Sequence, residues 1–163
     1  MKHLLEIKNL SIQYVTKEQV IKAVNRVTFN VNKGETFGLV GETGAGKTTT
    51  VLGVLRLLQT PPSDIYEGEI VFKGIDLLKA SESKMRKIRG KEISMIFQDP
   101  MTSLNPVIEV GDQVAEVIRL HDKCSRVDAN AKAAAMLEMV GIPANRMSEF
   151  PHQFSGGMKQ RVM

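Results

Sequence analysis

Two stretches near the N-terminus alternate apolar and polar residues, which is the pattern of half-buried strands. The alternation runs over residues 3–15 and 20–32, and a short polar stretch separates the two. Together they predict two strands of one sheet. Shorter apolar runs over residues 67–72 and 91–97 predict two more strands. The first part of the chain is therefore expected to be rich in β-structure.

Beyond residue 98 the apolar positions change to helical spacing. Residues 107–120 and 127–140 each predict an amphipathic helix. Two methionines of the second helix, Met136 and Met139, are expected to face a core, where their flexible side chains fill irregular gaps.

A short basic helix is predicted over residues 81–89, opened by Ser81 or Ser83, since serine is a favourable N-cap residue. The patterns divide the chain into residues 1–97, which are rich in strands, and residues 98–163, which are helical. The expected fold class is α/β.

A glycine-rich segment at residues 41–48, Gly-Glu-Thr-Gly-Ala-Gly-Lys-Thr, separates a short apolar run from a helical pattern. Residues 36–40 predict a buried strand, and residues 49–58 have apolar positions at helical spacing. The segment matches Gly-x4-Gly-Lys-Ser/Thr without a mismatch, and it has the strand before it and the helix after it that a phosphate-binding loop requires.

The residue types of this loop suit a nucleoside triphosphate. Glycines take backbone angles closed to other residues, so backbone N–H groups can form an anion-binding nest, and the helix adds its positive end. Lys47 is expected to bind the β- and γ-phosphates, Thr48 to ligate Mg²⁺ and Thr49 to bond the α-phosphate. The alternative is a glycine-rich turn that contains a lysine by chance. The predicted nucleotide-binding residues of this loop are Gly41, Glu42, Thr43, Gly44, Ala45, Gly46, Lys47, Thr48 and Thr49.

The composition of the chain excludes some classes of protein but does not indicate a function. The 163 residues are 42% hydrophobic and 25% charged, with a net charge of +4, which is ordinary for a globular domain. Cys124 is the single cysteine, so no internal disulfide can form and a reducing compartment is expected. No apolar run approaches the roughly 18 residues of a membrane span, and the N-terminus lacks the features of a signal peptide. A cytoplasmic location is expected.

A second motif, Phe154-Ser-Gly-Gly-Met-Lys-Gln160, stands near the C-terminus. The chain resembles the ATP-binding subunit of an ABC transporter, a P-loop NTPase. The resemblance rests on the order of three motifs: a phosphate loop, then the strand-terminal Gln98, then Ser-Gly-Gly-x-x-Gln-Arg. The resemblance covers the chain from end to end. Two positions depart from the usual signature, because Phe154 replaces a leucine and Met158 a glutamine. The longer strings at residues 96–106 and 150–162 resemble the dipeptide/oligopeptide/nickel importer branch.

The resemblance implies roles for particular residues. Lys47 and Gln98 would be the catalytic residues, with Gln98 and Thr48 at the Mg²⁺ ion. Tyr14 stands where the family places an aromatic ring against adenine, although a buried strand tyrosine is the alternative. In the family the signature is presented in trans to ATP held by a partner subunit. The signature residues carried over are Ser155, Gly156, Gly157 and Gln160.

The resemblance also implies cofactors, partners and a place in the cell. The cofactors would be ATP and Mg²⁺. The partners would be a second ATPase subunit, identical or homologous, two membrane permease subunits and, indirectly, an extracellular solute-binding protein for peptides or nickel. The subunit would work at the cytoplasmic face of the membrane. Residues 1–97 would form the N-terminal part of the ATPase core, and residues 98–163 the glutamine loop and the helical subdomain.

In the family, four apolar residues and Asp-Glu follow the signature, and a histidine comes later; the chain contains neither before Met163. It is therefore expected to resemble a chain truncated after the signature, with an incomplete sheet and little hydrolysis by itself. A nucleotide-binding module without hydrolysis is one alternative. An ABC-type nucleic-acid ATPase is another, disfavoured because no basic stripe with interleaved aromatics is present; nucleic acid is not expected as a partner.

Two features that contain histidine are not expected to be functional sites: His152 is expected to be a structural or surface residue, and His121, Asp122 and Cys124 are not expected to form a metal site. His152 precedes the signature and comes too early in the order to be the family's catalytic histidine. His121, Asp122 and Cys124 include metal-binding residue types but have no second cluster.

Overall fold

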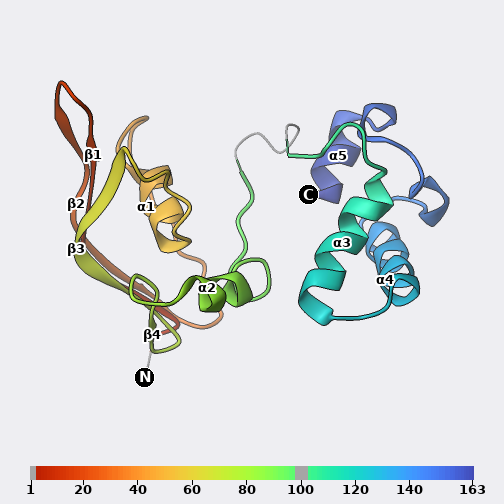
Figure 1. Ribbon diagram of the computed structural model, residues 1–163, viewed down its shortest axis with the longest axis horizontal. Helices are drawn as coiled ribbons and strands as arrows, with labels where there is room; N and C mark the ends of the chain where they lie inside the picture. The colour runs from red at the N-terminus through yellow and green to blue at the C-terminus, as the bar shows by residue number, and fades with distance from the viewer. Residues whose placement is uncertain (1–2, 98–102) are drawn as a thin grey trace. The chain divides into compact units, whose positions relative to one another are not determined.

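The chain folds into two compact units, Met1–Arg89 and Gly90–Met163, here called the N-terminal and the C-terminal unit. The computed structural model describes residues 3–97 and 103–163 (Figure 1). The sequence pattern placed the division after residue 97, whereas the units divide after Arg89.

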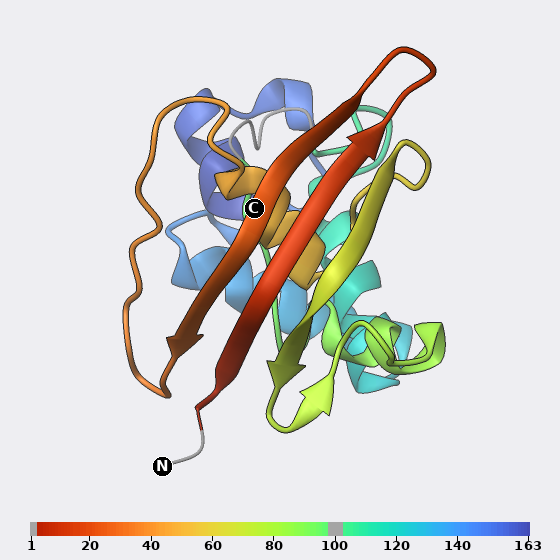
Figure 2. The same ribbon diagram turned by 90° about the vertical axis from the view of Figure 1, so that its left-hand side faces the viewer.

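The N-terminal unit is built on a four-stranded antiparallel sheet with the order β2-β1-β3-β4 (Figure 2). The strands are β1 (Leu5–Val15), β2 (Val20–Val31), β3 (Ser63–Phe72) and the two-residue β4 (Ile75–Asp76). The alternating patterns correctly predicted β1 and β2, and the apolar run over residues 67–72 predicted the second half of β3. The strand β4 was not predicted.

Irregular pairing in β1 explains which of its side chains are buried. Ile7, Leu10 and Ile12 are all fully buried, although strict alternation would place Leu10 and Ile12 on the face opposite to Ile7. The pairing with β2 shifts between Ile7 and Leu10, and Asn9 has a φ of 49°. An irregularity of this kind turns the side chains that follow it to the other face, so Leu10 joins the core.

Helix α1 (Lys47–Val54) packs directly against one face of the sheet, beside it in Figure 1 and behind the strands in Figure 2. Gly53 makes this close approach possible, because a Cβ at this position would lie 2.9 Å from Cδ1 of Ile12. The helix ends earlier than the expected residue 58, since Arg56 takes a left-handed conformation with a φ of 53°.

Helix α2 (Glu82–Ile88) begins at Ser81, whose hydroxyl accepts a hydrogen bond from the Lys84 N–H at 3.3 Å. The structure thus selects Ser81 rather than Ser83 as the N-cap residue. After the helix, the Arg89 guanidinium donates to the Leu55 carbonyl at 2.7 Å. This bond ties the end of α2 to the end of α1.

Two predicted strands are wrong. Residues 36–40 and 91–97 are apolar, but in the part of the chain that the structure describes neither segment pairs with a strand of the sheet. A strand persists only when neighbouring backbone groups satisfy its N–H and C=O groups. Both segments are instead exposed, with Val40 at 94% and Ile96 at 76% of their full accessibility. Phe37 stacks on Phe29 of β2, with ring centroids 4.8 Å apart.

The C-terminal unit contains the helices α3 (Val110–Asp122), α4 (Arg126–Met139) and α5 (Gly156–Val162). Short 3-10 turns, Ala144–Arg146 and Pro151–Gln153, connect α4 to α5. The sequence predicted α3 and α4 as two helices, and in the structure they form a hairpin (Figure 1). Along residues 3–97 and 103–163, no helix combines the length and the apolar character needed to cross a membrane.

Two small clusters form the core of this unit. One lies where α3 and α4 meet, and it is built from the small residues Ala115, Ala129 and Ala133. The other contains Val110, Leu137, Ile142 and Phe154.

The expectation for Met136 and Met139 is wrong, because their side chains are 53% and 83% exposed. The buried residues of α4 are Ala129, Ala133 and Leu137, which are four residues apart and share one face of the helix. Met136 and Met139 fall beside that face.

Candidate nucleotide-binding site

Residues 41–46 form a loop that leads into α1, with residues 41–45 exposed, and the helix begins at Lys47. The Lys47 side chain folds back over this loop. Its Nζ donates to the carbonyl oxygens of Gly41 at 2.5 Å and of Glu42 at 2.6 Å. The ammonium group therefore lies over the loop, beside the positive end of a helix.

The backbone of the loop depends on glycine at two positions. Gly44 and Gly46 have φ angles of 85° and 80°, which are left-handed. Gly46 is also buried, and a Cβ on it would overlap the Ala23 carbonyl oxygen of β2. Gly46 thus sets both the conformation of the loop and its close approach to the sheet.

Threonines of the first helical turn hold the loop and connect it to the sheet. The buried Thr50 donates its hydroxyl to the Gly46 carbonyl at 2.9 Å. The Thr49 hydroxyl lies 3.4 Å from the hydroxyl of Tyr14 on β1. Thr48 is exposed at the start of the helix. The structure therefore brings Tyr14 next to the predicted phosphate loop, with its ring partly exposed.

This arrangement suits an anionic ligand that carries several oxygens. Backbone N–H groups at a helix start, together with the helix dipole, attract anions, and a lysine ammonium adds a mobile positive charge. A threonine hydroxyl at the mouth of the loop is an oxygen ligand of the kind that Mg²⁺ takes alongside phosphate oxygens. The chemistry of the residues at 41–49 is thus compatible with MgATP.

The second motif opens helix α5. Ser155 is its N-cap residue, and the Ser155 hydroxyl accepts from the Met158 N–H at 3.4 Å. Gly156, Gly157 and Gln160 are exposed. The sequence motif is therefore an accessible helix start, whose serine and glycines can meet another molecule.

Arg146 and Glu149 form an ion pair near the second motif, and the sequence patterns did not single out either residue. Nε of Arg146 lies 3.0 and 2.9 Å from the two carboxylate oxygens of Glu149, and Nη2 lies 2.6 Å from Oε2. The hydrogen bonds from Arg146 lower the pKa of Glu149 below its usual value. The i, i+3 spacing was the only signal in the sequence.

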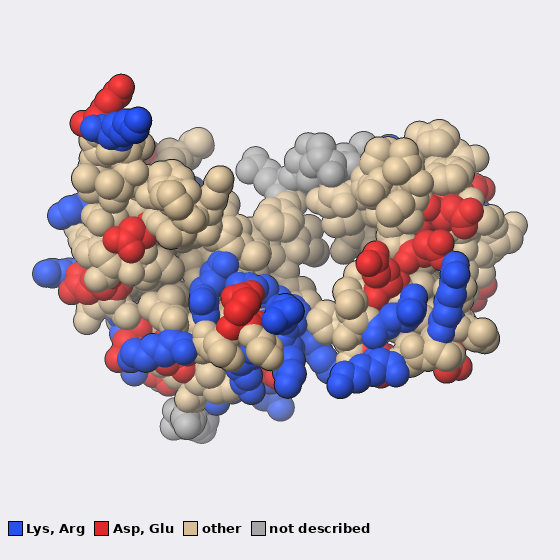
Figure 3. All heavy atoms as spheres, in the orientation of Figure 1, with Lys and Arg blue, Asp and Glu red and all other residues tan. Residues whose placement is uncertain are grey.

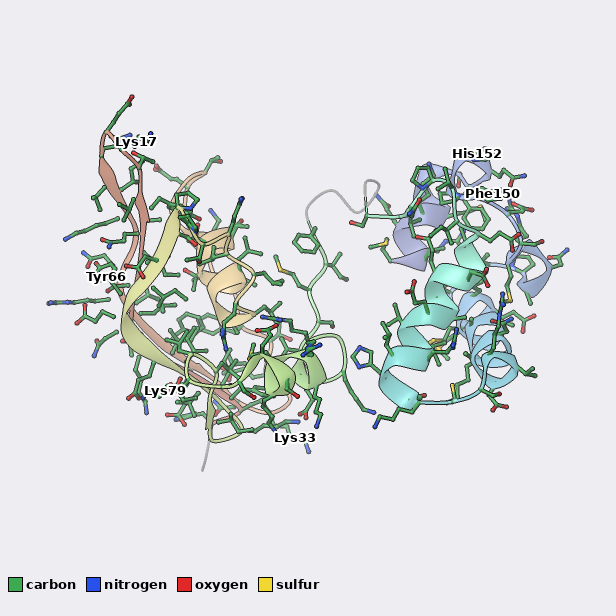
Figure 4. All side chains as sticks on the ribbon, viewed as in Figure 1. Lys17, Lys33, Tyr66, Lys79, Phe150 and His152 are labelled. Carbon is green, nitrogen blue, oxygen red and sulfur yellow. The ribbon has the colours of Figure 1, made fainter. Side chains whose placement is uncertain are left out.

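Other predicted residues take no part in a described site. Gln98 lies outside the described residues. His152 is exposed and stacks on Phe150, with ring centroids 5.8 Å apart (Figure 4). Within residues 3–97 and 103–163, no three His, Cys, Asp or Glu side chains gather in a way that could hold a metal ion, and this includes His121, Asp122 and Cys124.

The comparison with protein families identifies the class. The family model described as ABC transporter matches residues 24–163. The chain therefore belongs to the ABC transporter family, and the resemblance inferred from the two motifs is confirmed.

Two curated relatives and one solved structure are consistent with this family. An oligopeptide transport ATP-binding protein, OppD of Bacillus subtilis, is 49% identical over 162 residues, which are 98% of this chain and 45% of the relative. The dipeptide transport ATP-binding protein DppD of the same organism is 45% identical over 165 residues, which are 100% of this chain and 49% of the relative. The dimeric structure of MJ0796, a bacterial ABC transporter cassette, has a TM-score of 0.80 at 26% identity and covers 97% of this chain and 66% of that chain.

The comparisons confirm the fold class, a mixed α/β ATPase cassette of ABC type. The chain spans about half the length of the curated relatives it matches.

Proposed function

We propose that the chain is the ATP-binding part of an energy-coupling subunit of an ABC importer for peptides, with nickel as a less favoured cargo. The observation that carries the proposal is the position of the Lys47 ammonium, 2.5 Å from the Gly41 carbonyl, over a loop that opens α1. The names of the relatives, which are oligopeptide, dipeptide and glutathione import proteins, support the cargo class.

In this proposal the loop holds MgATP. Lys47 neutralises the β- and γ-phosphates, Thr48 ligates Mg²⁺, and Tyr14 stacks on adenine from the neighbouring strand. Its hydroxyl, 3.4 Å from that of Thr49, supports a place for Tyr14 beside the nucleotide. Gln98 would act at the Mg²⁺ ion or the attacking water.

The exposed start of α5 would act on a second subunit. Ser155, Gly156 and Gly157 would meet the γ-phosphate of an ATP bound to the loop of that subunit, identical or homologous to this one. The exposure of the two glycines supports a role in contact with another molecule. Two ATP molecules would then be held between two subunits.

We also propose that these 163 residues hydrolyse ATP weakly or not at all by themselves. Phosphoryl transfer depends on groups that position water and Mg²⁺, and the sequence holds no Asp-Glu pair after the signature. Nucleotide binding without turnover would then describe the chain in isolation.

The C-terminal unit carries a hollow that suits the permease subunits at the cytoplasmic face of the membrane. It has a volume of about 780 Å³, and its walls include Val117 and Ile118 of α3. Gln113 also lines the hollow, and its amide donates to the carbonyls of Asn105 and Ile108 at 3.0 and 2.9 Å. Ser103, Leu104 and Asn105 line the hollow, and they come soon after Gln98 in the sequence, where the family faces the membrane subunits.

Charge supports a protein partner over nucleic acid. On the face shown in Figure 3, basic and acidic side chains are interspersed, and the densest basic group lies near α2. No continuous basic band crosses that face, whereas nucleic-acid binding requires an extended positive surface.

The test is nucleotide affinity, measured with a fluorescent ATP analogue in the presence of Mg²⁺. Lys47→Ala removes charge-assisted hydrogen bonds to phosphate, so the Kd should rise at least about tenfold. The matched control is Lys17→Ala, which removes an exposed lysine from the tip of the β1–β2 hairpin (Figure 4) and should leave the Kd unchanged.

Equal affinities of Lys47→Ala and the unsubstituted chain would contradict the proposed site. ATP turnover measured on the same samples separates binding from hydrolysis. Turnover by the unsubstituted chain that Lys47→Ala abolishes would contradict the proposed weak hydrolysis.

A further inference from the structure

Arg146 is the centre of a cluster that surrounds the start of α5. Besides the bonds to the Glu149 carboxylate, its Nη2 lies 3.2 Å from the Gln153 carbonyl oxygen and its Nη1 lies 3.2 Å from the Met158 sulfur. Its guanidinium carbon stands 4.9 Å from the centre of the Phe154 ring. One side chain therefore contacts Gln153 and Phe154, which precede Ser155, and Met158, which follows it on the first turn of α5.

Each of these contacts fixes a different part of the approach to the helix. Gln153 and Phe154 are the two residues that lead into Ser155, and the Phe154 ring is 5% exposed in the core cluster with Val110 and Leu137. Met158 lies on the first turn of α5, and its N–H donates to the Ser155 hydroxyl. The planar guanidinium contacts both sides of Ser155, and a lysine ammonium cannot match this because it offers no planar fork.

The Glu149 carboxylate holds the guanidinium in place. Glu149 is anchored to α3, because its carbonyl accepts from the Val110 N–H at 2.9 Å. The Arg146 and Glu149 side chains are each 29% exposed, so the pair is shielded more than an ordinary surface pair. A fork bound to a carboxylate through two nitrogens has a defined orientation. The chain of contacts therefore runs from α3 through Glu149 and Arg146 to the start of α5.

We propose that Arg146 is a positioning residue for the signature: it orients Ser155, Gly156 and Gly157 so that a second copy of this chain can present its bound ATP to them. The inference rests on the proposed function, since it requires the signature to act on a nucleotide held by another subunit. Arg146 does not touch the nucleotide in this arrangement. It acts through Phe154 and the first turn of α5.

The experiment measures the association of two differently tagged copies, as the difference between MgATP and nucleotide-free buffer. Arg146→Gln should reduce this MgATP-dependent association about tenfold. Its affinity for the fluorescent ATP analogue should stay within about twofold of the unsubstituted chain, because the phosphate loop lies in the N-terminal unit. Arg126→Gln is the matched control: Arg126 pairs with Asp112 at 3.7 Å on the same unit and should show unchanged association.

A mixture distinguishes positioning from a general loss of structure. Lys47→Ala keeps the signature but loses the phosphate contact, whereas Arg146→Gln keeps the loop but misplaces the signature. Mixed together, they supply one intact loop and one intact signature that face each other. The mixture should associate at least about fivefold more strongly in MgATP than either variant alone.

Arg146→Lys provides a second test if Arg146→Gln is poorly folded by circular dichroism. It keeps the positive charge over the Phe154 ring but loses the fork, so association should fall while the helical signal is retained.

Three outcomes would contradict either the positioning role of Arg146 or the proposed function. Association of Arg146→Gln or of a folded Arg146→Lys equal to that of the unsubstituted chain would overturn the positioning role. Failure of the mixture to recover would also overturn it, since the defect would then not be confined to the signature. Absence of MgATP-dependent association in the unsubstituted chain would instead contradict the proposed function, on which this inference depends.

Discussion

At the scale of single residues, Gly46 requires glycine for two reasons, its left-handed backbone and its lack of space for a Cβ, whereas Gly44 requires it only for the first. Both have positive φ angles, of 80° and 85°, but only Gly46 lies where a Cβ would overlap backbone atoms of β2; at Gly44 no atom lies within 4 Å. The pair therefore distinguishes the cost of a left-handed backbone from the cost of steric overlap.

Alanine substitution at each position measures the two costs. Gly44→Ala should lower the free energy of unfolding by about 1–2 kcal/mol, the cost of a left-handed alanine. Gly46→Ala should lower it by at least about 1 kcal/mol more, because the loop or β2 must also move. Urea unfolding followed by tyrosine fluorescence measures this, since both tyrosines, Tyr14 and Tyr66, lie in the N-terminal unit. Equal losses for the two variants would show that the overlap at Gly46 is relieved without cost.

The sequence predicted a loop followed by a helix at this place, and the structure contains both, because the glycines and the helical spacing are local signals. Lys47 begins the helix and lies over the loop, as the pattern of glycines and lysine implied. Arg146 could not be found in the same way. Its partners lie at residues 149–158 and are brought around it by the 3-10 turns Ala144–Arg146 and Pro151–Gln153, which the helix and strand patterns did not predict.

At the scale of elements, the local sequence pattern predicted secondary structure correctly where a helix or hairpin makes its own backbone hydrogen bonds. The strands β1 and β2 pair with each other, and α3 and α4 pack as a hairpin, so short-range patterns were sufficient. The predictions failed for residues 36–40 and 91–97, whose apolar side chains indicate burial but whose backbone needs a distant strand. Apolar character alone does not supply that partner.

The connection from α4 to α5 allows a test of pH dependence. The bond from Arg146 lowers the pKa of Glu149 below its usual value of 4.5. The stabilisation is therefore complete above that value and is lost as the pH falls through the lower, folded pKa. Between pH 7 and about 3, the C-terminal unit of the unsubstituted chain should lose more stability than that of Glu149→Gln.

Urea unfolding followed by circular dichroism at 222 nm measures this difference, because the C-terminal unit is largely helical. The readout compares the two proteins at each pH, so carboxylates that both retain cancel. A loss of stability with acid that is identical in the two proteins would show that the Arg146–Glu149 pair does not contribute in solution.

At the scale of the whole molecule, the main liability is the exposed apolar segment before the phosphate loop. Phe37, Leu39 and Val40 are 42%, 36% and 94% exposed, and their backbone joins no strand of the described sheet. An exposed apolar segment with an unpaired backbone is a template for pairing with another chain.

We therefore expect the chain to self-associate in the absence of nucleotide, and Val40→Asp to reduce this association severalfold. Sedimentation velocity over a range of concentrations measures it. Val127→Asp is the matched control, because Val127 is 79% exposed but lies in α4, whose backbone is hydrogen-bonded within the helix. A monodisperse monomer before any substitution would contradict the expectation.

The hydroxyl pair of Tyr14 and Thr49 has a practical consequence for spectroscopy. The chain contains two tyrosines and no tryptophan, so its ultraviolet emission comes from Tyr14 and Tyr66 alone. Tyr14 stands 3.4 Å from the first turn of α1, within reach of whatever the loop holds, whereas Tyr66 is 40% exposed on β3. A Tyr66→Phe chain would emit from a single ring beside the phosphate loop, which makes the protein its own optical sensor for occupancy of that loop without an attached dye.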